Sequence, residues 1–324
     1  SLMIGLQNGE ASQAAGYVPA KEVGESLHAW IKQAVKSGTV KQGLLLLRTD
    51  TRNLEGRTPP TVQLYLDIEQ GKVAFLEGWP AVSDTDMTLW LDQEGLRIRS
   101  DDANIMRSAG NVEITSSPDV SRLSIKTHLS GAASDIQQIL NTPDIRQVVG
   151  DGLESWRISG SQTTDVSVDI ALEGRQPPKV QVVSYLKGGS FKDKAQTLAF
   201  TKINGTLRFS SVAGLSAKGL KSEFLGSPVV GNIETVAATS ESPAITRVSL
   251  NGALSAAALQ KWTDLSFLNS VKGAAAVAGR MDICDGSPLC NKLVVNTDLK
   301  GVELLLPAPY GKSSSDTKSL QLVG

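Results

Sequence analysis

The residues of this chain that could do chemistry are few and widely spaced. Its 324 residues include only two histidines, His28 and His128, and two cysteines, Cys284 and Cys290. General base catalysis needs a base within hydrogen-bonding reach of the group that it deprotonates, and no spacing here places either histidine in such a pattern. We therefore interpret both histidines as surface or boundary residues and expect no enzymatic activity.

Paired carboxylates are the second chemical candidate. Asp84 with Asp86, and Asp101 with Asp102, could form a metal site or the acid and base of a glycosidase. They lie in segments rich in Ser and Asp, where a short carboxylate commonly bonds to its own backbone. Gly188 and Gly189 do not open a helix and no Lys-Ser or Lys-Thr follows, so a phosphate-binding loop is not indicated. We expect no metal and no cofactor.

The two cysteines close the segment Cys284-Asp-Gly-Ser-Pro-Leu-Cys290. Asp-Gly and Ser-Pro are turn dipeptides, and the flanking runs have the pattern of strands. We predict a disulfide across a hairpin loop, which would imply an oxidising compartment. Two unpaired thiols are the first alternative. Zinc is the second, although it would need four ligands and both histidines lie far away in the sequence.

Composition argues against nucleic-acid binding, whether through charge or through stacking on single strands. The 32 Lys and Arg residues against 33 Asp and Glu leave a net charge of -1, and the basic residues are scattered, so no field attracts nucleic acid. Aromatic residues make up 5%, which is low for a surface that stacks on single strands.

Membrane-spanning helices are not indicated either. No stretch approaches the roughly 20 apolar residues that such a helix needs, and the short leucine runs at 44–47 and 304–306 are interpreted as buried strand. We expect a piece of a longer protein whose membrane anchor lies outside this sequence.

The elements that position these residues are mostly strands, because the dominant hydrophobic period is two. Apolar and polar residues alternate in many short runs separated by turn signals, among them Glu69-Gln-Gly71 and Gly188-Gly189. This pattern is typical of an antiparallel meander, here of about 15 to 18 strands. Two of the cleanest alternations give the candidate surface residues of the sheet: Val62, Leu64 and Leu66, and then Val166, Val168, Ile170 and Leu172.

Helical patterns are few. An apolar stripe from Val23 to Val35 predicts a helix closed by Gly38. Ser134 is expected to cap a short helix, Thr142-Pro143 to start another that ends near 149, and residues 255–262 to form a weaker one.

The same order of elements, a helix, then a tryptophan, then a strand, recurs along the chain, which predicts a loose repeat. We expect a lead-in or linker segment at 1–19, helix-plus-β units at 20–131 and 132–252, and a shorter unit at 253–324. A long β repeat with helices between its units favours a mainly β fold, namely an elongated, curved antiparallel sheet of groove-like, repeat type with a few short helices.

Three segments resemble a known family. The first runs from Lys300 to Lys312 and reads Lys-Gly-Val-Glu-Leu-Leu-Leu-Pro-Ala-Pro-Tyr-Gly-Lys, and the second is Leu76-Glu-Gly-Trp-Pro80. The third extends from Gly205 through the run at 214–220 to Pro228. Together they resemble the YhdP branch of the AsmA-like bacterial envelope proteins, in short pieces between about 30 and 312.

The resemblance implies a function without chemistry. It points to a periplasmic segment of an inner-membrane-anchored protein, with an apolar β groove that moves phospholipid between the inner and outer membranes and supports the outer-membrane permeability barrier. Phospholipid acyl chains would then be the partner, and the candidate surface residues above would line the groove. Membrane components would bind through regions outside this piece. The alternative is a periplasmic structural or adhesion-type β module with a closed core, because alternation cannot separate the two.

Overall fold

The computed structural model describes residues 1–17, 20, 24–48, 61–143, 146, 156–173, 176–193, 198–239, 244–284, 291–307 and 309–324. Within these residues the chain forms one open antiparallel sheet of 17 strands with a few short helices. The expected mainly β class is therefore confirmed. The chain divides into two compact units, one of residues 1–131 and 163–182 and one of residues 132–162 and 183–324. The predicted division into three repeats stays a prediction.

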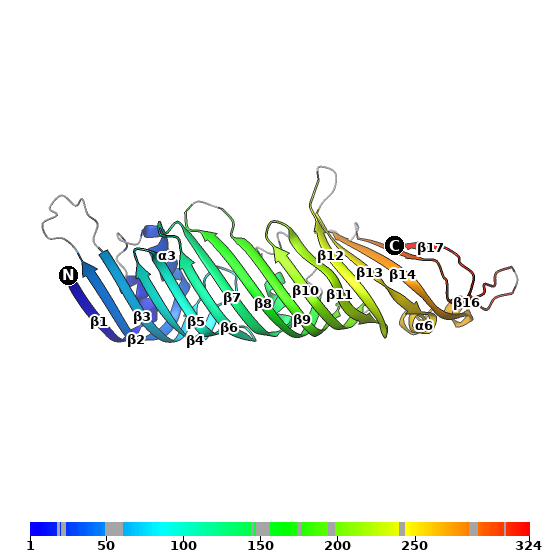
Figure 1. The fold of residues 1–324 in the computed structure, drawn as a ribbon, viewed down its shortest axis with the longest axis horizontal. Coiled ribbons are helices and arrows are strands. Elements are labelled where there is room, and N and C mark those ends of the chain that lie inside the picture. The colour runs from blue at the N-terminus through cyan, green and yellow to red at the C-terminus, as the bar shows by residue number, and fades with distance from the viewer. Residues whose placement is uncertain are drawn as a thin grey trace. The chain divides into compact units, whose positions relative to one another are not determined.

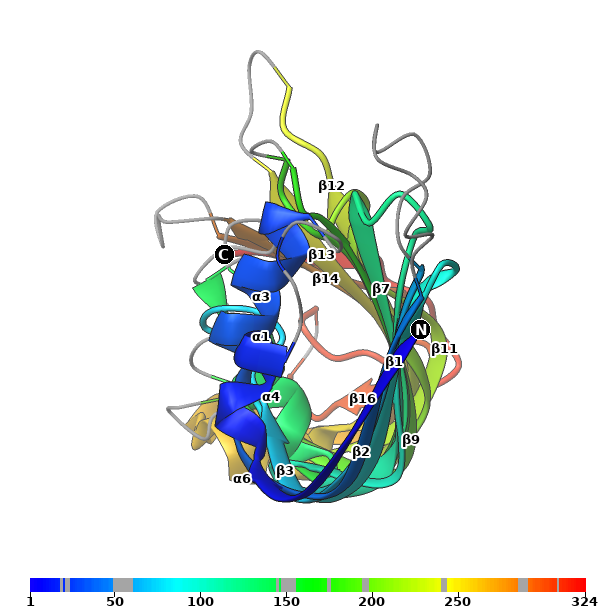
Figure 2. The same ribbon diagram turned by 90° about the vertical axis from the view of Figure 1, so that its left-hand side faces the viewer.

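The first unit consists of successive antiparallel strands with helices on one face (Figures 1 and 2). Its elements are β1 (Leu2–Glu10), η1 (Ala11–Gln13), α1 (Ala14–Tyr17), α3 (Glu25–Ala34), β2 (Val35–Arg48), β3 (Thr61–Val73), β4 (Val82–Asp92), β5 (Gly95–Ile105), β6 (Ser108–Ser116) and β7 (Arg122–Ala132). Parts of β8 (Arg157–Ala171) and β9 (Lys179–Lys192) complete it.

The second unit is also built mainly of antiparallel strands. It contains α4 (Ser134–Leu140), β10 (Ala199–Ser210), β11 (Gly214–Phe224), β12 (Ser227–Val236), β13 (Ile245–Ser255), α6 (Ala256–Thr263), η3 (Ser266–Ser270), β14 (Val271–Cys284), β15 (Lys292–Thr297), β16 (Val302–Leu304) and β17 (Leu320–Val323). Strands β10 to β15 pair in chain order, while β16 pairs with the start of β14 and β17 with β15.

Helix α3 packs on the sheet through the stripe that its sequence predicts. Leu27, Trp30 and Ile31 are buried, and the indole nitrogen of Trp30 donates to the carbonyl of Phe75 at 3.1 Å. The helix ends at Ala34, and Gly38, the expected cap, lies inside β2 with φ 137°. Of this prediction, Val23 lies outside the described residues.

The other helical predictions have mixed outcomes. A short helix, α4, forms as expected, but Ser134 is its first residue and Ala133 takes the N-cap position, so the predicted cap is wrong. The hydroxyl of Ser255 accepts a hydrogen bond from the backbone N–H of Ala258 at 3.1 Å, which caps α6. Most of the helix expected after Thr142 lies outside the described residues.

The expected lead-in at 1–19 differs most, because Leu2–Glu10 forms β1. β1 pairs with β2 over its whole length, from Leu2 opposite Leu47 to Glu10 opposite Thr39. The leucine run at 44–47 thus pairs with a segment that local sequence did not identify as a strand. The run is in a strand as expected but is not fully buried, since Leu44 is 41% exposed.

Several expected turns are bulges within strands. Gly71 lies inside β3, where the register against β4 shifts on both sides of it. The registers of β2 with β3 and of β5 with β6 also shift, the latter between Ser100 and Ala103. A Cβ on Gly71 would lie 2.5 Å from Met87 Cε, so a larger residue here would have to displace the Met87 side chain. Gly188 and Gly189, also expected as a turn, lie inside β9. A bulge bends the strand that carries it.

Candidate functional site

The sequence-predicted surface residues lie on one face of the first unit. Val168 is 0% exposed, Leu66 1% and Leu64 4%; Val166 and Ile170 are also buried, whereas Val62 and Leu172 are half-buried. The backbone N–H of Leu172 donates to the carbonyl oxygen of Ser121. Because β7 and β8 run antiparallel, a pair four residues along places Val168 opposite Ile125. The structure therefore brings the two predicted groups onto the same face. Their contact with a ligand stays a prediction.

One row across this face joins the two groups. Its members face each other in strand after strand, and none exceeds 3% exposure. We call it the aliphatic row, and it consists of Leu66, Leu89, Ile98, Ile114, Ile125 and Val168. Cross-strand aliphatic contacts of this kind stabilise a sheet, so the row is part of the core of the first unit.

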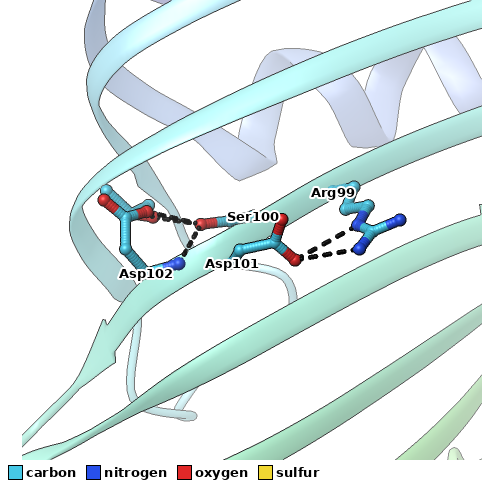
Figure 3. A network of polar contacts seen from close by, with 5 residues as sticks. Arg99, Ser100, Asp101 and Asp102 are labelled. Carbon is cyan, nitrogen blue, oxygen red and sulfur yellow. Dashed lines mark hydrogen bonds and ion pairs between the residues drawn. The ribbon is translucent and has the colours of Figure 1, made fainter.

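A polar cluster lies where β5 bulges (Figure 3). Asp102 Oδ1 accepts from the hydroxyls of Thr85 at 2.9 Å and Ser100 at 3.0 Å, and the two hydroxyls also bond to each other. The hydrogen bond from Thr85 is the main reason that the pKa of Asp102 lies below its usual value. Asp101 instead accepts from Arg99 Nη2 at 3.1 Å. The two neighbouring carboxylates therefore have separate partners and do not form an acid–base pair.

The contacts of the other acidic pair run to the neighbouring strands β3 and β5, whereas bonds to its own backbone were expected. Asp86 Oδ1 accepts the N–H of Gln70 at 3.2 Å, and the carbonyl of Asp84 accepts from Asn104. Among the described residues, no group of three His, Cys, Asp or Glu is placed to hold a metal ion.

The histidines lie apart. His28 Nε2 is 2.9 Å from the carbonyl oxygen of Ala15, and His128 Nδ1 is 2.6 Å from Asp165 Oδ1. Both members of the second pair are about half exposed, on the face opposite the aliphatic row. Cys284 is buried at the end of β14, and Cys290 lies outside the described residues, so their disulfide stays a prediction.

The second unit carries an apolar face that sequence analysis did not single out. On β12 to β15 every side chain of one face is uncharged, and most are only half-buried. We call this the uncharged face. It consists of Val229, Gly231, Ile233, Thr235, Thr246, Val248, Leu250, Gly252, Leu254, Ala275, Val277, Gly279, Met281, Ile283, Leu293, Val295 and Thr297. Glycine and alanine interrupt its alternation, which is why the run of large apolar residues that marks β3 and β8 is absent from these strands.

Exposure distinguishes the uncharged face from the aliphatic row. One cross-strand line on it runs through Ile233, Val248 and Met281 to Leu293. The first three are half-buried, and Leu293 is 46% exposed. Apolar surface that protein does not cover is available to an apolar ligand.

The opposite face of the same strands is charged. Arg247 Nε donates to Asp282 Oδ1 at 2.8 Å, and its Nη1 lies 3.6 Å from Glu234 Oε1. The hydrogen bond from Arg247 holds the pKa of Asp282 below its usual value, and the same bond raises the pKa of Arg247. Strands β12 to β14 therefore have one polar and one apolar face, which the alternation of side chains requires.

Five aromatic rings form a continuous line in the second unit, which we call the aromatic ladder. Each ring contacts the next, with centroids 4.9 to 6.0 Å apart, in the order Trp156, Phe191, Phe200, Phe224 and Trp262. Phe200 and Phe224 face each other across β10 and β11, and Trp262 belongs to α6. Sequence spacing gives no sign of this line, because its members come from five separate segments.

An open antiparallel sheet with an uncharged, partly exposed face defines a class of β protein suited to contact with apolar molecules. The chain belongs to the YhdP protein family, whose model matches residues 1–323. It is 20% identical over 324 residues to the intermembrane phospholipid transporter YhdP of Escherichia coli (strain K12). The match covers 97% of this chain and 25% of that relative, so the chain spans about a quarter of its length.

No solved structure matches the chain. Among the described residues, none of the helices combines the length and the apolarity needed to cross a membrane. The resemblance seen in the three sequence motifs is thus confirmed at the level of the family.

Proposed function

We propose that this chain is the lipid-carrying part of a phospholipid transporter in the periplasm, and that the uncharged face contacts the acyl chains. The observation that carries the proposal is the exposure of that face: its side chains are uncharged, mostly apolar and mostly half-buried, while the reverse face holds the ion pairs. The family and the phospholipid transporter that the chain resembles supply the class of ligand.

The physical basis is transfer between similar environments. Each methylene that leaves water for an apolar surface gains about 0.8 kcal/mol, so a chain that remains on apolar surface moves without a large barrier from hydration. A charged side chain in its path would be unpaired and costly, which accounts for the absence of charge from the uncharged face. No covalent step is required, and we propose a non-enzymatic role.

Extraction of the purified protein with organic solvent tests the proposal directly. We expect phospholipid in the extract by mass spectrometry. Val248→Asp, in the middle of the uncharged face, should remove the lipid while circular dichroism shows an unchanged fold, because a half-buried carboxylate can still reach water.

The matched control is the next residue of the same strand. Ser249 is on the charged face, so Ser249→Asp should retain the lipid. A protein without lipid, or equal lipid content in the two variants, would contradict the proposal and favour a structural module with a closed core. The buried aliphatic row of the first unit is the observation that favours this second candidate.

Transport between the inner and outer membranes would place the chain in the periplasm and link it to the outer-membrane permeability barrier. Partners at the two membranes would then contact regions beyond this sequence. Deleting the corresponding segment from the full-length protein should raise the sensitivity of cells to large antibiotics, and unchanged sensitivity would count against the role in the barrier.

A further inference from the structure

Six large apolar side chains of the second unit are exposed in three connected segments beside the start of β14. Trp262 of α6 is 42% exposed, Phe267 of η3 is 65% and Tyr310 is 71%. We call the set the terminal apolar patch, and it consists of Trp262, Leu265, Phe267, Leu305, Leu306 and Tyr310. Exposed apolar side chains scattered singly need no explanation, but a group of six does.

The segments are held together by backbone bonds. The N–H of Leu305 donates to the carbonyl of Ser270, the last residue of η3, at 2.8 Å. Leu304 also pairs with Val271, the first residue of β14. The loop that presents Leu305 and Leu306 therefore starts directly beside η3.

The described residues at the end of this loop are held against those at its start. Lys312 is 8% exposed, and its ammonium donates to the carbonyls of Leu299, Val302 and Ser313 at 2.8 to 2.9 Å. A Cβ on Gly311 would lie 2.7 Å from the carbonyl oxygen of Leu306, so a larger residue would push the loop apart. A loop fixed in this way keeps its apolar side chains in water, which costs free energy unless a ligand covers them.

The patch is continuous with the apolar interior of the same unit. The ring of Trp262 packs edge-on against Phe224 at a centroid distance of 5.8 Å, and Phe224 is 6% exposed. Phe224 faces Ser227 of β12, and the same side of β12 carries Val229 of the uncharged face. Apolar surface therefore leads from water at Trp262 to the uncharged face.

We propose that the terminal apolar patch contacts the acyl chains of a phospholipid as the lipid moves onto or off the uncharged face. This inference rests on the proposed function and adds the site at which transfer occurs. Aromatic and leucine side chains fit this ligand, because the patch carries no charge and Trp and Tyr rings favour the boundary between apolar chains and water.

Quenching of tryptophan fluorescence tests the contact. Phospholipid brominated in its acyl chains, presented in vesicles to the wild-type chain, should reduce the emission relative to the unbrominated lipid. Trp262→Phe should abolish most of that reduction. The matched control is Trp90→Phe: Trp90 is 39% exposed, nearly the same as Trp262, but pairs with Tyr65 on the face opposite the aliphatic row.

The outcomes separate the two proposals. Equal quenching in the wild type and in Trp262→Phe would overturn the terminal apolar patch, even if extraction still yields lipid. If the extract contains no phospholipid and brominated lipid does not quench the wild-type chain, the proposed function itself is overturned.

A kinetic measurement adds a readout that does not depend on tryptophan. Phe267→Ser combined with Leu306→Ser should slow the capture of a fluorescent phospholipid from vesicles severalfold and leave the melting temperature unchanged, because both side chains are exposed. Val212→Ser changes an equally apolar but isolated residue, 83% exposed, and should have no effect. Unchanged capture by the double variant would overturn the role in transfer.

Discussion

The ammonium of Lys312 donates a hydrogen bond to the carbonyl of Val302 at 2.8 Å, across ten residues of the chain. Two further carbonyls, of Leu299 and Ser313, complete its partners. The lysine that ends the most distinctive sequence motif is thus a structural residue, which holds the loop between β16 and the end of the motif. We expect the positions of Leu305, Leu306 and Tyr310 in the terminal apolar patch to depend on these hydrogen bonds.

Replacing this lysine should therefore destabilise the chain. Lys312→Met keeps the aliphatic stem but removes three hydrogen bonds, among them the buried one to the carbonyl of Val302, and a buried unsatisfied group costs about 1 to 3 kcal/mol. Urea unfolding should show the loss. Lys318→Met changes an exposed lysine of the same segment and should stay within about 0.5 kcal/mol of the wild type. Equal midpoints for the two variants would show that the hydrogen bonds of Lys312 contribute little.

Stability should fall in acid through the Arg247–Asp282 pair. Hydrogen bonding to Arg247 lowers the folded-state pKa of Asp282, so the pair stabilises the fold above the unfolded-state pKa of about 3.9. That contribution is lost as the pH falls from there through the lower folded-state pKa. Melting temperatures between neutral pH and pH 2 should show a smaller acid-induced drop in Asp282→Asn. Asp264→Asn, at the exposed end of α6, should behave as the wild type, and a drop of unchanged size in Asp282→Asn would exclude the pair as its source.

The aliphatic row should not tolerate charge. Val168 is 0% exposed, so Val168→Asp would bury an unpaired carboxylate and cost at least about 3 kcal/mol. We expect loss of the folded signal in circular dichroism or a large fall in melting temperature. Asp169→Val, the adjacent residue on the other face, is the control and should fold. A folded Val168→Asp protein that has lost its lipid would instead place the predicted residues of the first unit on the lipid surface.

Cys284 and Cys290 are predicted to form a disulfide. The loop that they close is short, so loop entropy gives only about 2 kcal/mol, and reduction should lower the melting temperature slightly without unfolding the chain. Thiol labelling of the native, unreduced protein should find neither cysteine. Labelling of both would refute the bond, and with it the argument from cysteine chemistry for an oxidising compartment.

Local sequence was sufficient for most of the strands, although not for β1, and for the side of the sheet on which their residues lie. Alternation fixes the face of each side chain because successive residues of a strand point in opposite directions, so the neighbours of Leu66 and Val168 in the chain suffice to assign both to apolar faces. The stripe of Leu27, Trp30 and Ile31 likewise predicted α3. The family resemblance was recognised from three short motifs, which can be identified without knowing what their residues contact.

Glycines were the main source of error in the local analysis. Gly71 and Gly188 have the sequence context of turns, but each lies within a strand. Glycine permits both a chain reversal and a bulge, and the choice between them depends on the neighbouring strand, here on the close approach of Met87 to Gly71. Gly38 was predicted to cap the helix but lies within β2, because pairing of β2 with β3 outweighs its tendency to cap a helix.

Only the tertiary structure decided which apolar surface is covered. The aliphatic row and the uncharged face have the same period, yet Val168 is fully buried and Leu293 is 46% exposed. Leu305 and Leu306 were expected in a buried strand and instead lie in water beside η3. The aromatic ladder joins Trp156 to Trp262 through strands that no local pattern connects. Burial depends on what packs above a side chain, and that packing involves residues distant in sequence, so alternation determines the face while the assembled sheet determines the exposure.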